Sequence, residues 1–490
     1  MLKIKKRHML NQSFSFENFK IIHEIENRKG NYYKDFYSDE YHLASTLLKA
    51  KRRDFKAEKN KAIRDEAAYT LAFEQKEALE DLKENHLEND LNKFSNEVNR
   101  SDFNFKLTPF IPEPGSKTIY TTSKDAVSFF AMKQLQYNIF RTFKVKQANR
   151  YQIVKQVKIL LQDKFPKFII RTDIKSFYEN VPQYELLKLI ENNSLLSPKS
   201  VSLIKNLLYN YNILTNQLGV KEKLRKGIPR GIGVSPFLAE LYMRKIDEEI
   251  KNIESVTFYG RYVDDIIIFF TPKSKYSSDN YLNKVKKIIE DKGLNINDDI
   301  IPGKYPKTQE VDLLNNNTTT KDISLLGYKF KIANSEFKDV ELSENKKRKY
   351  KERITKSIDK YLNEYPHNSI EARKLLIHRF NYLTKNSKLH QPKKGLIGVY
   401  YSNSLLENDC VSLNRLDQML HTVVDTKLPI MEFSNLNKRL KKFSFLKGFN
   451  EKSFYNINGK KKNIPDLRSA KYKTAKILTN NFERIVEAWK

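Results

Sequence analysis

The sequence predicts an α+β protein with an antiparallel sheet near the middle of the chain and mostly helical ends. Three observations carry this prediction. Residues 38–98 are charged, nearly free of Gly and Pro, and repeat Leu and Ala at helical spacing. Residues 168–173 and 257–270 are rich in β-branched and aromatic residues, as buried strands are. From about Asn334 onward strand signals largely vanish, and apolar residues recur at helical spacing.

Composition favours a soluble protein that binds a polyanion. The 490 residues suffice for two or three domains, and 90 Lys and Arg against 59 Asp and Glu give a formal net charge of +31. The single cysteine, Cys410, excludes a disulfide framework and a cysteine-based zinc site. The N-terminus lacks the apolar core of a signal peptide, and no apolar run is long enough to cross a bilayer. We therefore expect a cytoplasmic protein with no membrane partner.

A cluster of three prolines and a glycine at residues 109–115 marks a boundary in the chain. We expect a helical N-terminal extension over residues 1–108, a central domain over 109–333 and a helical domain over 334–490. Basic runs such as residues 346–349 are, taken alone, often only solvated faces.

The central segment predicts alternating helices and strands. We expect strands at 117–120, 168–173, 294–297 and 324–330, and helices at 125–143, 151–162, 186–214 and 282–292, with 186–214 divided at Ser197-Pro198 and 282–292 closed by Gly293.

Two adjacent acids, Asp264 and Asp265, interrupt the apolar run at 257–270. The pattern predicts two buried strands joined by a tight turn that holds both carboxylates at its tip. Adjacent carboxylates in an apolar setting are costly to ionise unless a cation lies against them, and Mg²⁺ prefers oxygen ligands. Alone, the pair fits a simple polar turn about equally well.

Two stretches upstream fit the same site. Asp173 ends a predicted strand, where it either caps the next helix or supplies a third carboxylate beside the Ile174 carbonyl. Residues 227–236 form a Gly-rich loop that opens into a helix at Ser235-Pro236, and its glycines let the backbone approach a partner closely.

In combination and order, Asp173, the loop at 227–236, the Asp264-Asp265 pair and the strands after them resemble the reverse transcriptase family. The resemblance covers about residues 117–332. It implies a right-hand polymerase, with fingers and palm over 109–333 and a helical thumb or C-terminal domain over 334–490.

The resemblance also implies roles for particular residues. Asp173, with the Ile174 carbonyl, and Asp264 would bind two Mg²⁺ ions, with Mn²⁺ as the alternative, and Asp265 would assist. Such a site transfers a nucleotide with one metal activating the attacking hydroxyl and the other stabilising pyrophosphate. Tyr178 would be the steric gate, and Arg230 and Gly231 would form the loop beside the nucleotide and template. Lys117 and Arg150 would contact the triphosphate, and Lys307, or else Lys304, would correspond to the lysine of the family's Lys-Thr pair. Gly327 and Tyr328 would form the primer grip.

The order of motifs and the helical C-terminal domain look most like the bacterial abortive-infection and "unknown group" clade of defence-associated reverse transcriptases. The resemblance implies an RNA template, with an associated non-coding RNA as one source, together with dNTPs and a DNA product. Whether the chain forms a homo-oligomer stays open. Template-independent terminal transfer and a non-catalytic RNA-binding scaffold remain the alternatives, and the intact acids argue against the scaffold.

Some members of that clade prime DNA synthesis on their own side chains. A phenol can replace a primer hydroxyl, and the C-terminal region offers many tyrosines beside basic residues. The candidates are Tyr361, Tyr400, Tyr401 and Tyr455, although any one of the 27 tyrosines is more often a packed or surface residue.

Overall fold

The structure, a computed structural model, describes residues 11–30, 34–60, 65–163, 165–192, 195–272, 280–299, 306–314, 321–389, 395–457 and 481–489. The chain divides into two compact units, each built from segments that are separate in sequence. The first unit comprises residues 1–148, 174–253 and 280–297, and the second comprises 149–173, 254–279 and 298–490.

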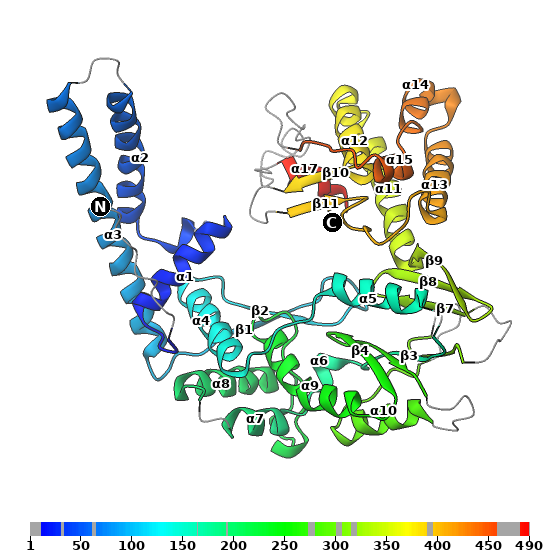
Figure 1. Ribbon diagram of the computed structural model, residues 1–490. Coiled ribbons are helices and arrows are strands. Elements are labelled where there is room, and N and C mark those ends of the chain that lie inside the picture. Colours follow the sequence, from blue (N-terminus) through cyan, green and yellow to red (C-terminus); the bar gives the residue numbers. More distant parts are fainter. Residues whose placement is uncertain are drawn as a thin grey trace. The chain divides into compact units, whose positions relative to one another are not determined.

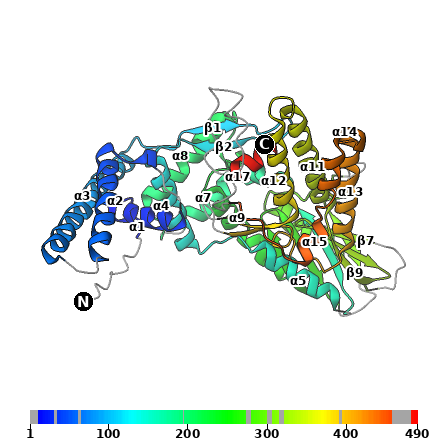
Figure 2. The same cartoon turned by 90° about the horizontal axis from the view of Figure 1, so that it is seen from above.

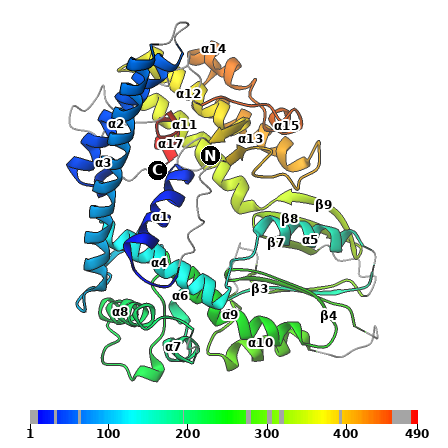
Figure 3. The same cartoon turned by 60° about the vertical axis from the view of Figure 1, so that its left-hand side comes forward.

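The first unit begins with helices that confirm the helical prediction for residues 38–98. Helix α1 (Phe16–Lys29) is followed by η1 (Lys34–Phe36) and by the long helices α2 (Asp39–Lys59) and α3 (Glu66–Asn99), which pack side by side (Figure 1). Their starts are fixed by side chains that accept backbone N–H groups, Ser38 for α2 and Asp65 for α3. Helix α1 packs on both α3 and α4 (Figure 3).

The remainder of the first unit is one hairpin and a set of helices. Strands β1 (Leu107–Phe110) and β2 (Ile119–Thr122) pair antiparallel. The helices are α4 (Ala126–Phe143), α6 (Phe177–Asn180), α7 (Gln183–Glu191), α8 (Pro198–Leu214), η2 (Glu222–Leu224), α9 (Ser235–Lys251) and α10 (Tyr281–Asp291).

The second unit contains the predicted antiparallel sheet. Its strands are β3 (Phe168–Asp173), β4 (Val256–Tyr262), β5 (Asp265–Phe270) and β6 (Gln309–Asp312), in the spatial order β4-β5-β3-β6. Every residue of β5 after Asp265 is buried, as its continuous apolar run requires. Helix α5 (Arg150–Gln162) packs on β4 and on β9.

A second sheet follows, made of β7 (Lys321–Leu325), β8 (Tyr328–Ala333) and β9 (Glu336–Leu342). In its described residues, the C-terminal part then consists of helices α11 to α15 and α17, the hairpin β10–β11 and η3. Helices α11, α12, α13 and α14 lie side by side (Figure 2). Their bounds are α11 (Glu344–Glu364), α12 (Ser369–Thr384), β10 (Asn386–Leu389), β11 (Gly395–Gly398), α13 (Val411–Lys427), α14 (Ile430–Leu440), α15 (Phe445–Asn450), α17 (Asn481–Val486) and η3 (Glu487–Trp489).

One apolar core runs through the second unit. It joins Ile169 of β3 and Phe269 of β5 to Phe330 of β8, and continues to Leu416 of α13 and Phe445 of α15. The sheet β4-β5-β3-β6, called the palm sheet below, and the C-terminal helices are therefore stabilised by the same buried surface. The predicted α+β class, with an antiparallel sheet and a mostly helical C-terminal part, is confirmed.

The structure corrects the sequence prediction in three places. The strand predicted at 324–330 is divided by a turn at Leu326 and Gly327, with β7 before it and β8 after it. Residues 294–297 do not form a strand: Ile296 makes only an isolated bridge with Ile174. Strand signals do not end near Asn334 either, because β9, β10 and β11 follow it. None of the helices in the described part of the chain is long and apolar enough to cross a membrane.

Candidate active site

Two of the three predicted catalytic acids face each other in the palm sheet. Asp173 is the last residue of β3, Asp265 is the first residue of β5, and the antiparallel register pairs them directly. Side chains paired in this way have Cβ atoms about 5 Å apart. Asp173 starts no helix, since Ser176 occupies the N-cap of α6, so the structure gives no support to the capping alternative.

Asp264 lies beside them in the turn between β4 and β5, as the sequence predicts. Tyr262 and Asp265 pair across a turn of two residues, Val263 and Asp264. Val263 has a φ of 60°, a left-handed conformation that is strained for a β-branched residue. Arg261 donates a hydrogen bond of 3.0 Å to the Val263 carbonyl and helps to hold this turn.

Two cationic side chains neutralise the paired acids. Lys307 Nζ lies 2.9 Å from Asp173 Oδ2, and the Arg171 guanidinium lies 2.8 Å from Asp265 Oδ1. Arg171 also donates to the Lys307 carbonyl, which links the two pairs. Burial raises the pKa of Asp265, Arg171 opposes this shift, and the charges of Asp264 and Asp173 add to it.

The carboxylates partly fit a divalent ion. Asp173 Oδ1 is buried and has no hydrogen-bond partner, and hard cations prefer such oxygens. Among the described residues, however, no group of three or more His, Cys, Asp and Glu side chains is arranged to hold a metal ion. Lys307 instead contributes the positive charge beside Asp173, and a metal ion would compete with it for Oδ2.

A cavity of about 610 Å³ in the second unit is lined by Asp264 and Asp265 and also by Gly327 of the predicted primer grip. The turn between β7 and β8 contains Gly327, with a φ of 82°, and a Cβ atom there would lie 2.8 Å from the Arg150 guanidinium. Arg150 donates a hydrogen bond to the Leu326 carbonyl. The structure thus places Arg150 at the predicted primer grip, in the same cavity as two of the acids.

Lys346, from the first turn of α11, also lines this cavity, and sequence reasoning missed its role there. Its Nζ lies 4.9 Å from the centre of the Tyr328 ring and donates a hydrogen bond of 2.9 Å to the Ser402 carbonyl. Burial and, to a lesser extent, the charge of Arg150 together lower the pKa of Lys346 to about 8. Lys349 and Arg353 of α11 line the same cavity. The basic run at residues 346–349 was the sequence signal that could have identified Lys346.

Other predicted nucleotide-binding residues gather in the first unit, around Glu179. The Arg230 guanidinium makes two hydrogen bonds to Glu179, of 3.0 and 3.2 Å, and Lys117 Nζ lies 3.2 Å from the same carboxylate. Arg230 also covers Tyr178, with its Cζ 4.9 Å from the ring centre. Burial alone would raise the pKa of Glu179, but Arg230 and Lys117 together bring it below its usual value. Glu179 is a second residue that sequence reasoning missed.

The glycine loop packs on the β1–β2 hairpin of the first unit. Gly231 has a φ of 96°, and a Cβ atom there would clash with the Ile119 side chain and lie 2.8 Å from the Tyr120 carbonyl. Tyr120 N–H donates a hydrogen bond of 2.7 Å to the Arg230 carbonyl. Glycine at position 231 is therefore required by backbone conformation and by close packing.

Two further sets of predicted residues can be placed. Lys307 contacts Asp173, while Lys304 lies outside the described residues.

Among the candidate priming residues, Tyr361 and Tyr455 are buried, with 1% and 5% exposure, and Tyr400 and Tyr401 are half-buried. Tyr455 OH is hydrogen-bonded to His378 Nδ1.

Residues 117–330, which include all three acids, the glycine loop and the primer-grip turn, match the sequence model of the family Reverse transcriptase (RNA-dependent DNA polymerase). These residues form a reverse transcriptase domain. The activity of such a domain is DNA synthesis on an RNA template. Helices α1 to α3 and α11 to α17 lie outside the matched segment of the reverse transcriptase domain.

Solved structures of telomerases are similar to the chain at low scores. An apo telomerase from Candida tropicalis, truncated from its C-terminal domain, has 15% identity and a TM-score of 0.32, covering 57% of this chain and 71% of that chain. A telomerase from Candida albicans in complex with a fragment of telomeric RNA has 13% identity and a TM-score of 0.33, covering 75% and 71%. The curated proteins contain no match. The reverse transcriptase assignment rests on the family match alone.

Proposed function

We propose that this chain is a bacterial antiphage reverse transcriptase that copies RNA into DNA at Asp173, Asp264 and Asp265 with two divalent ions. The observation that carries the polymerase proposal is the direct pairing of Asp173 with Asp265, next to the turn that holds Asp264. The defence role is supported by the resemblance of the motif order to abortive-infection enzymes.

The proposed metal site uses the carboxylate oxygens of the three acids. Bound divalent ions would lower the pKa of the attacking hydroxyl and stabilise the leaving pyrophosphate. Asp173 offers the buried, unpartnered Oδ1, and the Arg171 contact fixes the orientation of Asp265. Mg²⁺ fits these ligands, and Mn²⁺ takes the same oxygen donors.

Asp264→Asn tests this site. We expect incorporation of labelled dNTPs to fall by about a hundredfold or more, because a charged ligand is lost where cations must lie. The matched control is Glu310→Gln, which removes an exposed carboxylate from β6 of the same sheet. Equal activity of Asp264→Asn and wild type, with both folded by circular dichroism, would exclude the assignment.

We propose that the ring of Tyr178 excludes ribonucleotides. Tyr178 is buried beneath Arg230, and its carbonyl accepts a 2.7 Å hydrogen bond from the Ile228 N–H of the glycine loop. Tyr178→Ala opens that space, so we expect the preference for dNTPs over rNTPs to fall. An unchanged ratio of the two kcat/KM values would make Tyr178 only a packed aromatic residue.

The template is proposed to be RNA, with an associated non-coding RNA as one source. Sequencing the nucleic acid that copurifies with the protein identifies the template and the DNA product. Ribonuclease treatment before the assay separates the alternatives: incorporation should stop if RNA is copied. Incorporation that survives would indicate template-independent terminal transfer.

Priming on the protein itself is proposed for Tyr400 or Tyr401, because their half-exposed side chains can reach solvent. The hydroxyls of Tyr361 and Tyr455 would first have to leave the core. Protein incubated with labelled dNTPs and no primer should retain label after boiling in detergent, and the double change Tyr400→Phe/Tyr401→Phe should abolish this retention. Label that always separates from the protein would leave an RNA 3′ end as the primer.

A further inference from the structure

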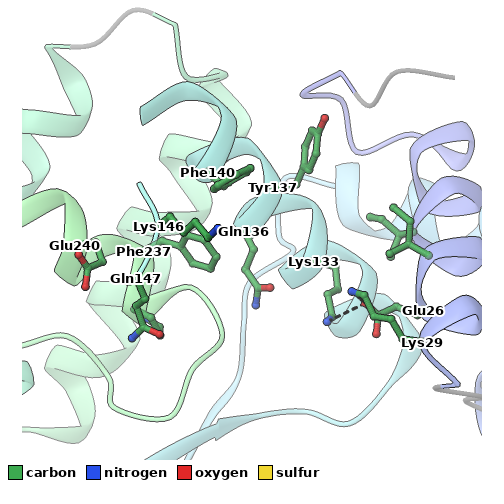
Figure 4. Close-up of a pocket in the computed structure, with 13 residues that line it drawn as sticks. Glu26, Lys29, Lys133, Gln136, Tyr137, Phe140, Lys146, Gln147, Phe237 and Glu240 are labelled. Carbon is green, nitrogen blue, oxygen red and sulfur yellow. Dashed lines mark hydrogen bonds and ion pairs between the residues drawn. The ribbon is translucent and has the colours of Figure 1, made fainter. Parts of the chain in front are cut away.

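A cavity of about 600 Å³ lies in the first unit, and none of the three acids lines it. Its floor is one face of α4, where Lys133, Gln136, Tyr137 and Phe140 recur at helical spacing (Figure 4). Helix α1 forms one wall, and the start of α9 forms the other. The volume falls within the range of about 300–1,000 Å³ that is typical of small-ligand sites.

The cavity offers flat aromatic surfaces. Tyr137 and Phe140 of α4 and Phe237 of α9 line it, and Phe140 is 37% exposed although it is a large apolar residue. The Arg141 guanidinium lies 5.9 Å from the centre of the Tyr137 ring. Aromatic rings combined with nearby cations are the usual means of holding unpaired bases, because every base has a face that stacks.

The walls carry more positive than negative charge. Lys29, Lys133 and Lys146 line the cavity, together with Glu26 and Glu240. The carboxylate of Glu26 is almost fully buried and lies 2.8 Å from Lys29 Nζ and 3.2 Å from Lys133 Nζ. Glu26 therefore fixes two ammonium groups at the edge of the cavity, and the exposed Lys146 adds a third.

The cavity adjoins the glycine loop of the reverse transcriptase domain. Phe237 follows that loop directly in α9, and a Cβ atom on Gly233 would clash with the Gln136 side chain from the cavity floor. The α1 wall, in contrast, belongs to the N-terminal extension outside the matched residues 117–330. The extension and the reverse transcriptase domain thus build this cavity together.

We propose that this cavity binds a nucleotide of single-stranded RNA, with the base against Tyr137, Phe140 and Phe237 and the phosphates near Lys29 and Lys146. This inference rests on the proposed function, and it assigns the N-terminal extension a part in holding RNA. The aromatic rings of the cavity suit a base, while the ammonium groups at the edge suit its backbone.

Photochemical crosslinking locates the RNA directly. The full-length protein is irradiated with a single-stranded RNA of about eight nucleotides that contains 4-thiouridine, and the crosslinked peptides are identified by mass spectrometry. We expect crosslinks within residues 133–147 or at Phe237. Crosslinks that all fall elsewhere would overturn the proposal.

Affinity measurements supply the second test, since Tyr137→Ala and Lys146→Glu change the floor and the edge separately. Each should raise the Kd for the same RNA about tenfold, close to the loss of one stacked base or phosphate contact. The matched controls are Tyr209→Ala, an exposed tyrosine of α8, and Lys245→Glu, an exposed lysine of α9 outside the cavity. Equal Kd values for cavity and control variants would also overturn the proposal, and would fit a cavity for an acidic peptide instead.

The activity of the wild-type protein separates the two proposals. If dNTP incorporation is observed but neither crosslinks nor affinity point to the cavity, only the cavity proposal fails. If RNA binds in the cavity but the wild type incorporates no dNTP, the polymerase proposal fails and the RNA site stands.

Discussion

At Asp173, a lysine from a distant part of the chain neutralises a carboxylate that is almost fully buried. Lys307 is itself half-exposed, so the pair lies at the border between protein and solvent. Removal of one member of a buried pair leaves an uncompensated charge, which usually costs about 3–5 kcal/mol.

Lys307→Met should therefore destabilise the protein when no metal is present. We expect the free energy of unfolding to fall by about 1–3 kcal/mol, less than for a fully buried pair because solvent screens Lys307. Mg²⁺ should restore part of this loss, since it supplies a cation at the same carboxylate. Urea unfolding with and without Mg²⁺ measures both effects. Lys338→Met, which breaks an exposed pair with Glu336, is the control, and an equal response of the two variants would contradict the argument.

Arg230 determines how firmly Tyr178 is held. Its guanidinium covers the ring while Glu179 fixes the guanidinium by two hydrogen bonds. Arg230→Gln removes this cover, so we expect the preference for dNTPs over rNTPs to fall several-fold. Arg230→Lys should have a preference between those of the wild type and Arg230→Gln, because Lys cannot form the two-point contact with Glu179. The ratio of kcat/KM values is the measurement. Arg52→Gln, which breaks the pair with Glu80 in the α2–α3 helices, should leave that ratio unchanged.

At the scale of elements, α11 brings a lysine of lowered pKa to the turn between β7 and β8. The Lys346 ammonium lies over the Tyr328 ring of β8, and the charge of Arg150 of α5 acts on it. The cavity that Lys346 lines is also lined by Asp264, Asp265, Lys349 and Arg353. With a pKa of about 8, Lys346 loses its positive charge within the range accessible to an assay.

We expect affinity for a primer–template duplex to fall as the pH rises from 7 to 9, because Lys346 then becomes neutral. Protein stability, in contrast, should rise with pH. Between about pH 8 and 10.5 the unfolded chain binds more protons than the folded one, so this group makes unfolding less favourable as the pH rises. Fluorescence anisotropy at each pH gives the Kd. Lys346→Arg keeps its charge throughout and should remove the pH dependence; an unchanged profile would assign the effect to another group.

The glycine loop depends on one residue without a side chain. Gly231→Ala should lower the free energy of unfolding by about 1–3 kcal/mol, because the new Cβ meets Ile119 and the Tyr120 carbonyl at a left-handed φ. Gly219→Ala is the matched control, since a Cβ atom there has no neighbour within 4 Å. Chemical denaturation compares the two, and equal stability would show that the loop can move off β2.

Sequence patterns predicted those elements whose secondary structure is determined by their own residues and not by partners elsewhere in the chain. The spacing in α2 and α3 and the apolar run of β5 are local signals, and so is the turn that holds Asp264. Strand β6 was missed because its four residues, two of them acidic, carry little strand signal and gain their place by pairing with β3. Glu179 and Lys346 were missed because their roles depend on Arg230 and on Tyr328, which lie far from them in sequence.

At the scale of the whole molecule, the net charge of +31 should make RNA binding depend steeply on salt. For about six phosphate contacts on a single strand, the slope of log affinity against log salt should be about −4, because each contact releases condensed counterions. Titrations at several salt concentrations give this slope. Lys146→Glu should make it shallower, and a flat slope for the wild type would show that the charge serves solubility only.

The core shared by the palm sheet and the C-terminal helices has a consequence for synthesis of the chain on the ribosome. Phe269 leaves the ribosome 180 residues before Phe449, although both belong to one core. At translation rates of about 5–20 residues per second, the strand from Ile266 to Phe270 waits roughly 10–35 seconds for its last partners. Such a segment, apolar and rich in β-branched and aromatic residues, is prone to aggregate while it waits. Slower growth at low temperature or extra chaperone should therefore raise the yield of folded protein.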